Sequence, residues 1–258
     1  MGPHPRVAKH MTKTRDNLFE SGIAEPFRFD ARVSRVFSDM IKRSVPGYGL
    51  FLEALAVVAR QFLREGGHVY DLGCSLGACS LAIQQAVPDR AFRLTAVDNS
   101  PAMIEHARAA LMDSGNAASV QLLEADILEI AFDAPSLVVL GFTLQFLPLA
   151  ARNQLLTRIA ESMPDDGVVV LAEKVHFDDP GTQALQTGLH LEFKRTQAYS
   201  ELEIAGKRQA LENVLITDTV AEHVTRLERA GFECVTPVLQ AFNFVTLLAQ
   251  RRMQGPGG

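Results

Sequence analysis

The stretch Tyr70-Asp71-Leu72-Gly73-Cys74-Ser75-Leu76-Gly77 decides the fold of this 258-residue chain. A short strand-like run, residues 68–70, precedes it, and residues 78–83 follow it with the pattern of a helix opening. Strand, glycine turn and helix N-terminus in this order are typical of a nucleotide-like ligand site at the carboxyl end of a parallel sheet. Gly73 and Gly77 lack a Cβ, which lets the backbone turn tightly and approach a ligand. The stretch is not the dinucleotide pattern Gly-x-Gly-x-x-Gly, because Ser75 replaces the second glycine.

Acidic residues end the next two predicted strands. Residues 92–97 form a strand-like run that ends at Asp98. An acidic residue about 20 positions after such a glycine turn accepts hydrogen bonds from ribose hydroxyls. Capping of the next helix is the alternative, although Ser100 can cap it, with Pro101 at its first position, while Asp98 faces the ligand. A third strand, 119–124, leads to Asp126 and Ile127, which we expect at the same edge of the sheet.

The remaining pattern alternates between strands and helices. Further strands are predicted over 136–141 and 167–173, and helices over 78–87, 101–113, 150–162 and 219–230. Such alternation implies a parallel sheet covered on both faces. Two final strands, 234–239 and 242–249, read as a hairpin whose last strand is antiparallel. We therefore predict an α/β, Rossmann-like fold with a seven-stranded, mostly parallel sheet and helices on both faces.

The expected organisation is a single domain over residues 18–250. Residues 1–17 precede the domain and are interpreted as a solvated tail, which we favour over an arm that contacts RNA. A polar, glycine-rich end over 251–258 follows the domain. Helices over 31–43 and 50–63 predict an N-terminal helical lid within 18–66, with Tyr48 in the break between them. Residues 176–217 interrupt the alternation and predict a helical insertion that builds an acceptor site or a subunit interface.

Composition excludes several classes of function. The net charge of −5 argues against a broad nucleic-acid-binding face. No apolar run approaches the ~18 residues that span a membrane, and no secretory signal is evident. The three cysteines show neither a disulfide framework nor metal-ligand spacing, which indicates a reduced cytoplasmic setting and no metal. Cys74, inside the glycine turn, is interpreted as a small packing residue.

The glycine turn is similar to the Asp-x-Gly-x-x-x-Gly loop of class I S-adenosylmethionine (SAM)-dependent methyltransferases. More specifically, from about residue 18 to about residue 248 the chain resembles the carboxy-S-adenosyl-L-methionine (carboxy-SAM) synthase family. The stretches that carry this resemblance are FDARVSRVFSDMIKRSVPGY (29–48), VYDLGCSLGACS (69–80), AVDNSPAMIEHAR (96–108), FTLQFL (142–147) and FKRTQAYSELEIAGKRQALENVLITDTV (193–220). The second and third occur in many methyltransferases, whereas the first and last make the resemblance specific.

The resemblance implies a reaction between SAM and prephenate. The products would be phenylpyruvate and carboxy-SAM, the carboxymethyl donor for wobble-uridine modification of tRNA. It also implies ligand contacts from Tyr48, Gly73, Cys74, Ser75, Asp98, Asn99, Asp126, Ile127 and Gly141. Arg208 would bind a carboxylate, across the interface of a homodimer, and Tyr48 and Arg208 would be the catalytic residues. The family pattern has an asparagine at position 141, so Gly141 lacks an amide that contacts the ligand.

Two other functions remain open from the residues alone. One is an ordinary SAM-dependent methyltransferase, and the other is a non-catalytic SAM-binding partner of a tRNA-modifying enzyme. Arg208 discriminates, because a cation beside a sulfonium is unfavourable unless an anion lies between them. The competing interpretation of Arg208 is a solvated side chain paired with Glu212. No residue is assigned as general base; His190, in the insertion, is interpreted as a surface or packing residue.

Overall fold

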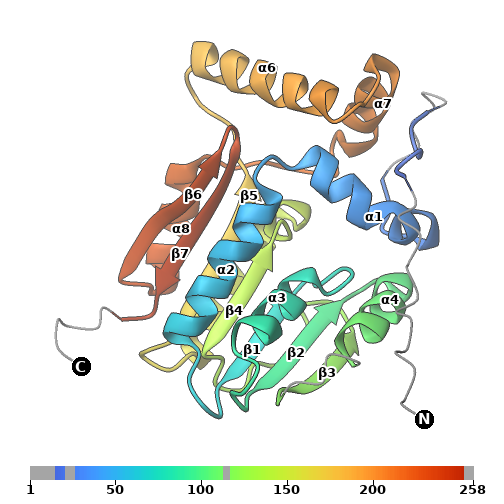
Figure 1. The fold of residues 1–258 in the computed structure, drawn as a ribbon. Helices are drawn as coiled ribbons and strands as arrows, with labels where there is room; N and C mark the ends of the chain where they lie inside the picture. The colour runs from blue at the N-terminus through green and yellow to red at the C-terminus, as the bar shows by residue number, and fades with distance from the viewer. Residues whose placement is uncertain (1–14, 21–26, 113–116, 253–258) are drawn as a thin grey trace, which may run out of the picture.

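A computed structural model describes residues 15–20, 27–112 and 117–252, and Figure 1 shows its fold. Seven strands form one sheet in the order β3-β2-β1-β4-β5-β7-β6. Neighbouring strands from β3 to β5 are parallel, and β7 runs antiparallel to both β5 and β6. The predicted mostly parallel, seven-stranded sheet is therefore confirmed. The strands are β1 (His68–Leu72), β2 (Arg93–Asp98), β3 (Ser119–Glu124), β4 (Leu137–Gly141), β5 (Val168–Lys174), β6 (Cys234–Ala241) and β7 (Phe244–Gln250).

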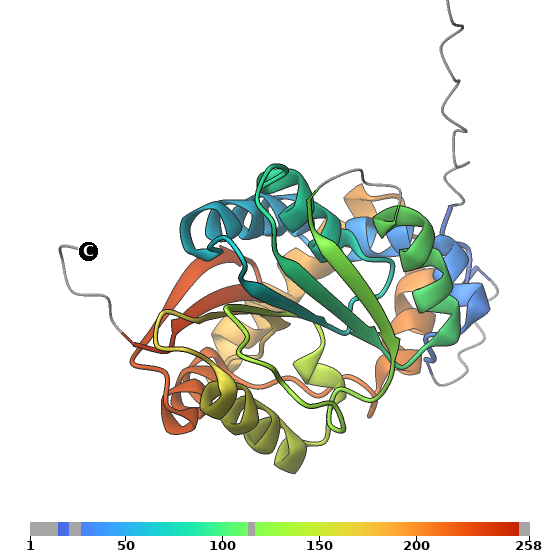
Figure 2. The same ribbon diagram turned by 90° about the horizontal axis from the view of Figure 1, so that it is seen from below.

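Helices cover both faces of the sheet (Figures 1 and 2). Helices α2 and α3 pack on one face of the sheet, and α5 and α8 pack on the other. Successive side chains of β4 point to opposite faces: Val139 packs in the hydrophobic cluster that contains α2 residues, whereas Val138 packs in the cluster that contains α5 residues. The predicted two-sided covering is confirmed. The helices are α1 (Ala31–Ser44), α2 (Tyr48–Phe62), α3 (Ala78–Ala86), α4 (Pro101–Leu111), the short 3-10 helix η1 (Leu144–Phe146), α5 (Leu149–Ser162), α6 (Pro180–Thr196), α7 (Glu201–Leu211) and α8 (Val220–Ala230).

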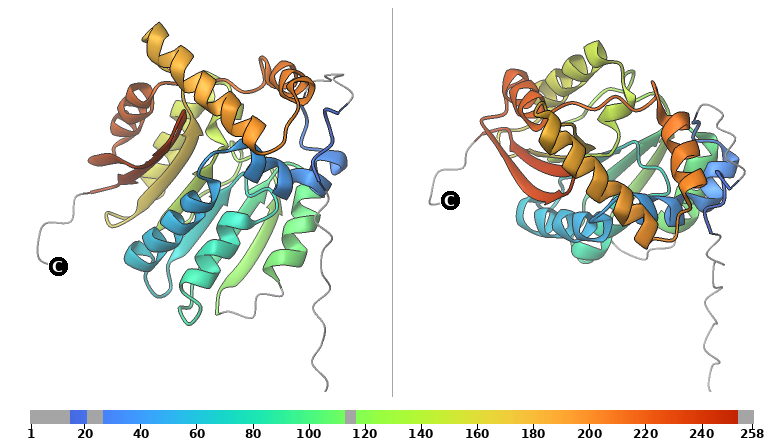
Figure 3. Two further views of the ribbon diagram at one scale, coloured as in Figure 1. Left: turned by 45° about the horizontal axis from the view of Figure 1, so that its top comes forward. Right: turned by 90° about the horizontal axis from the view of Figure 1, so that it is seen from above.

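A helical cap lies over the carboxyl ends of the parallel strands. It consists of α1 together with α6 and α7, and the view from above shows α6 crossing over the strand ends (Figure 3). The insertion predicted over 176–217 is thus helical and sits over the predicted ligand edge. Of the lid predicted within 18–66, α1 serves as a cap, whereas α2 covers a face, because its Phe51 and Leu55 are buried against the sheet.

The start of α2 differs from the prediction. The helix begins at Tyr48 and not at Leu50, so Tyr48 does not lie in a break. The physical reason is Gly47, whose φ of +76° turns the chain immediately, so that Phe51 N–H donates to the Gly47 carbonyl at 2.9 Å and closes the first turn.

The predicted ends of the domain are wrong by a few residues. Residues 1–14 and 253–258 lie outside the described residues. Asp16, expected in the tail, is buried at 1% exposure, and its N–H donates to Asp39 Oδ2 at 2.8 Å. Arg251 is held by the Ala160 carbonyl, to which its Nε donates at 3.0 Å. Both side chains belong to the folded body because their polar groups have partners there. Within the described parts of the chain, no helix combines the length and apolar character needed to cross a bilayer.

Candidate active site at the carboxyl edge of the sheet

The glycine turn after β1 is locked to β2. The N–H groups of Gly73 and Cys74 both donate to the Val97 carbonyl, at 2.8 and 2.9 Å. Gly73 has a φ of +75°, and a Cβ there would lie 2.5 Å from Oγ1 of Thr143. That hydroxyl is itself fixed, because it donates to the Leu72 carbonyl at 2.9 Å. Only glycine fits this position, which accounts for the motif in local physical terms.

Asp98, the last residue of β2, reaches back to the turn. Its Oδ2 accepts from the Ser75 N–H and its Oδ1 from the Ser100 N–H, both at 2.9 Å. Burial raises the pKa of Asp98, and these two hydrogen bonds oppose that rise. Ser100 meanwhile caps α4, because its Oγ accepts from the Met103 N–H. Capping is thus performed by Ser100, and each Asp98 oxygen keeps a lone pair for a ligand hydroxyl.

Asp71 supports the same turn from inside the sheet. It is buried, and its Oδ2 accepts from the N–H and the hydroxyl of Ser80 at 3.0 and 2.6 Å. Burial raises its pKa to about 6 despite these bonds. The Cys74 side chain points elsewhere, into a cluster with Ala96 and Ile104, and burial raises its pKa. Cys74 is therefore a packing residue, as predicted, and only its backbone is left to meet a ligand.

The remaining predicted contacts on this side lie after β2 and β3. Asn99 and Asp126 are exposed, whereas Ile127 is buried in the core. The Asp126 Oδ1 accepts from the Leu128 N–H at 2.9 Å and so fixes the loop. Because β1, β2 and β3 are parallel neighbours, these residues and the glycine turn share one edge of the sheet.

Aromatic rings line the edge beyond β1. Tyr48 is 7% exposed, and its ring centroid lies 6.3 Å from that of Phe142, the residue after β4. Burial raises the pKa of Tyr48, so its phenol stays protonated at neutral pH. Phe142 has a φ of +62°, which is strained for a large side chain and occurs preferentially at functional sites.

Gly141 ends β4 beside these rings. A Cβ there would lie 3.3 Å from Cys79 Sγ and 3.4 Å from Phe51 Cζ. A side chain at position 141 would thus point toward α2 and α3, into a tightly packed region. The asparagine of the family pattern fits here only if Phe51 and Cys79 move by a few tenths of an ångström.

Glu173 belongs to the site although it was not predicted from the sequence. This residue is buried near the end of β5, and its two oxygens accept from the N–H groups of Leu144 and Gln145 at 2.8 and 3.1 Å. Burial raises its pKa to about 8. Glu173 therefore fixes η1, the turn that follows Phe142. The sequence offered one signal for this residue: the two charged residues Glu173 and Lys174 stand at the end of a strand predicted to be buried.

A group of basic side chains was also missed. Lys174 ends β5, Lys194 lies on α6, and Lys207 lies on α7. Their charges all act on His190, which is buried as predicted for a packing residue and whose Nε2 donates to the Ser44 carbonyl at 2.9 Å. Burial and these three ammonium groups lower the pKa of His190 to about 3.

Arg208 lies on α7 with its side chain exposed, next to buried Lys207. Within the described residues its guanidinium makes neither a hydrogen bond nor an ion pair. The competing prediction, a helical pair with Glu212, is wrong, because α7 ends at Leu211 and Glu212 leaves the helix with φ −60° and ψ 130°.

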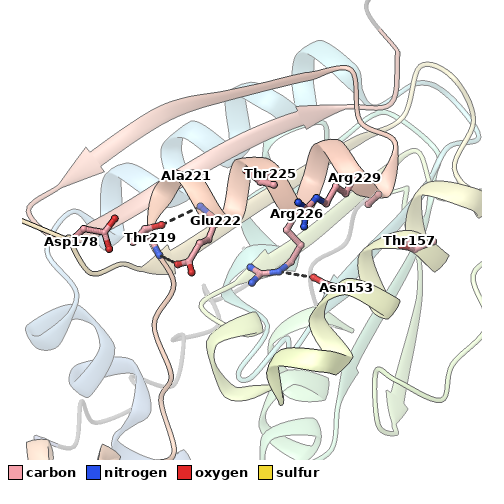
Figure 4. Close-up of a pocket in the computed structure, with 10 residues that line it drawn as sticks. Asn153, Thr157, Asp178, Thr219, Ala221, Glu222, Thr225, Arg226 and Arg229 are labelled. Carbon is pink, nitrogen blue, oxygen red and sulfur yellow. Dashed lines mark hydrogen bonds between the residues drawn. The ribbon is translucent and has the colours of Figure 1, made fainter.

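A groove of about 530 Å³ lies away from this edge, between α5 and α8 (Figure 4). Four of its polar residues bond to one another in two pairs. Arg226 Nε donates to Asn153 Oδ1 at 2.9 Å, and Thr219 and Glu222 form the N-terminal capping box of α8. None of the ligand residues predicted from the sequence lines it.

Comparison with known proteins agrees with this geometry. A protein family described as "Methyltransferase domain" matches residues 69–167. Human N-acetylserotonin methyltransferase in complex with SAM superposes with a TM-score of 0.60 at 15% identity, over 86% of this chain and 56% of that one. An O-methyltransferase family protein from Burkholderia thailandensis gives 0.59 at 14% identity, over 88% and 64%. The fold is that of the class I SAM-dependent methyltransferases.

Sequence relatives define the family within that class. The carboxy-SAM synthase of Trichlorobacter lovleyi is 47% identical over 242 residues, which cover 93% of this chain and 99% of the relative. That of Marinobacter nauticus is 48% identical over 225 residues, 87% of this chain and 90% of the relative. The chain belongs to the carboxy-SAM synthase family.

Proposed function

We propose that this protein converts SAM and prephenate into carboxy-SAM and phenylpyruvate, and so supplies the carboxymethyl donor for wobble-uridine modification of tRNA. The observation that carries the proposal is the extent of the similarity to carboxy-SAM synthases. It covers 93% of the chain and therefore includes the α6–α7 insertion, which lies beyond the methyltransferase match over 69–167. The three free cysteines are in keeping with a reduced, cytoplasmic setting.

The reaction balances without an oxidant or a metal. Prephenate loses CO2, and the electron pair of the broken carbon–carbon bond makes the ring aromatic and expels the ring hydroxyl. The sulfonium methyl loses a proton, and its carbon forms the new bond to CO2. Proton and hydroxide together leave as water. A capped site keeps CO2 close to the methyl carbon and excludes bulk water.

The residues at the sheet edge fit SAM as a ligand. Asp98 accepts from the ribose hydroxyls with Asn99 beside it, and Asp126 and Ile127 border the adenine. The backbone of the Gly73–Ser75 turn meets the methionine part, and Tyr48 and Gly141 lie toward the sulfonium. The buried carboxylates of Asp71 and Asp98 favour a cationic ligand over an anionic one.

Arg208 binds the new carboxylate in this proposal, and it acts in the site of a second copy. Its exposure on α7 supports this, because the side chain has no acidic partner among the described residues of its own chain. Leu185 and Leu189 of α6 and Leu202 of α7 are also exposed, at 62%, 39% and 54%, and would be covered in a two-fold dimer. A guanidinium grips a carboxylate with two parallel hydrogen bonds, which fixes its position.

Incubation of the purified protein with SAM and prephenate tests the proposal. Mass spectrometry should detect carboxy-SAM and phenylpyruvate, and the Arg208→Ala variant should bind SAM but form neither product. Methyl transfer to an added acceptor without carboxy-SAM would identify an ordinary methyltransferase. Ligand binding without turnover would identify a non-catalytic SAM-binding protein.

A further inference from the structure

The basic group under the cap carries an excess of positive charge. Lys194 is 9% exposed, and neither it nor Lys174 donates from its ammonium to any acceptor among the residues that the structure describes. The pKa of Lys194 falls to about 8 because of burial and the nearby Lys174 charge. An unpaired buried ammonium is unfavourable by itself and becomes favourable when an anion binds it.

The neighbouring charges are already engaged. Lys207 Nζ donates to Ser44 Oγ at 2.6 Å and lies 3.8 Å from the Asp16 carboxylate. Arg43 pairs with Asp39 and donates to the carbonyls of Gln197 and Ala198. Lys174 and Lys194 are therefore the two cations of the group that lack a negatively charged partner among the described residues.

Their position connects them to the SAM edge. Lys174 ends β5, the parallel neighbour of β4, and pairs in register with Phe244 of β7. The Phe244 ring lies 5.0 Å from His190 and 6.0 Å from Phe142, centroid to centroid, and Phe142 in turn neighbours Tyr48. A wall of rings thus runs from Tyr48, beside the sulfonium, to the two free ammonium groups.

We propose that Lys174 and Lys194 bind the carboxylate on the three-carbon oxo-acid side chain of prephenate, and that Phe142 and Phe244 carry its six-membered ring. The inference rests on the proposed function and assigns the second substrate to a site of its own. A carboxylate carried close to a six-membered carbon ring is matched by two cations at the end of an apolar wall.

The chemistry selects which of the two carboxylates the lysines hold. The ring carboxylate departs as neutral CO2, so its negative charge disappears in the transition state. Cations on that group would stabilise the ground state more than the transition state and would slow the reaction. The side-chain carboxylate keeps its charge throughout, and phenylpyruvate retains it. Holding this group anchors the substrate and leaves the ring carboxylate free to leave.

Calorimetry with phenylpyruvate and steady-state kinetics with prephenate test the inference on the SAM-loaded protein. Lys194→Met removes the charge and keeps the stem. It should raise the Kd for phenylpyruvate and the KM for prephenate by similar factors of at least about tenfold, with the Kd for SAM unchanged. Lys194→Arg should restore part of the binding. Arg195→Met is the matched control, because Arg195 is the next cation on α6 and pairs with Glu192 and Glu201 on the exposed side.

The outcomes separate the inference from the proposed function. If the wild-type protein makes carboxy-SAM but Lys194→Met binds phenylpyruvate as tightly as the wild type, the inference is wrong and the function stands. A rise in KM for prephenate alone would mean that the lysine holds the departing carboxylate, which also overturns it. If the wild-type protein neither binds nor converts prephenate, the proposed function falls and the inference with it.

Discussion

Lys194→Met should make the substrate-free protein more stable while it impairs substrate binding. The wild-type ammonium is buried without a counter-charge, and methionine has a similar length and no charge. Removing an unpaired buried charge relieves a desolvation penalty, and the unfolded chain, in which both side chains are hydrated, is affected much less.

The magnitude follows from the pKa of Lys194, which is about 8 in place of 10.5. One pKa unit corresponds to about 1.4 kcal/mol, so the charged lysine destabilises the folded state by about 3 kcal/mol at pH 7. The folded state releases the proton above pH 8, whereas the unfolded state keeps it until about pH 10.5. Wild-type stability at this site therefore rises with pH between these values, and the advantage of methionine falls to below about 1 kcal/mol at pH 10.

Urea unfolding of both proteins at pH 7 and pH 10 measures this difference, in buffers free of phosphate and sulfate, which would bind the lysines. Lys174 is the cation that lowers the pKa of Lys194, and the Lys194 charge in turn lowers the pKa values of His190 and Lys207. Removing the Lys194 charge relieves these two neighbours as well, which acts in the same direction as the expected stabilisation. Asp16, Asp39 and Arg43 act on Lys207 and are unchanged in the variant. A variant that is no more stable than the wild type at pH 7, or whose advantage is the same at both pH values, would refute the reasoning.

Three further substitutions examine the SAM edge and the interface. Asp98→Ala should weaken SAM binding at least tenfold while the protein stays folded, since charge-assisted hydrogen bonds contribute about 1.5–3 kcal/mol each; an unchanged affinity by calorimetry would remove the ribose assignment. Gly141→Asn should tighten carboxy-SAM binding. It should also lower the free energy of unfolding by about 1–3 kcal/mol, because the new side chain crowds Cys79. A variant that fails to fold would show that position 141 requires glycine. Mixed dimers of Arg208→Ala and Asp98→Ala subunits should regain part of the activity, because one site then combines an intact pocket with an intact arginine. No recovery after confirmed subunit exchange would place Arg208 outside the partner's site.

Local signals made the sheet and the glycine turn predictable. Gly73 is dictated by its own turn and by Thr143, and Asp98 follows directly from the strand that precedes it. The start of α2 was misplaced because the positive φ of Gly47 cannot be distinguished in the sequence from an ordinary break. The lysine group could not be predicted, because Lys174, Lys194 and Lys207 are each unremarkable in their own segment. They meet only when α6 and α7 fold back over the strand ends.

Consecutive residues on α7 lie on different faces of the helix: Lys207 is buried toward its own Ser44, and Arg208 is exposed. In the proposed dimer, one turn of α7 therefore both packs onto its own subunit's cap and supplies a side chain to the partner's site. A substitution that displaces α7 is therefore expected to impair two sites, the one its own subunit caps and the one its arginine completes.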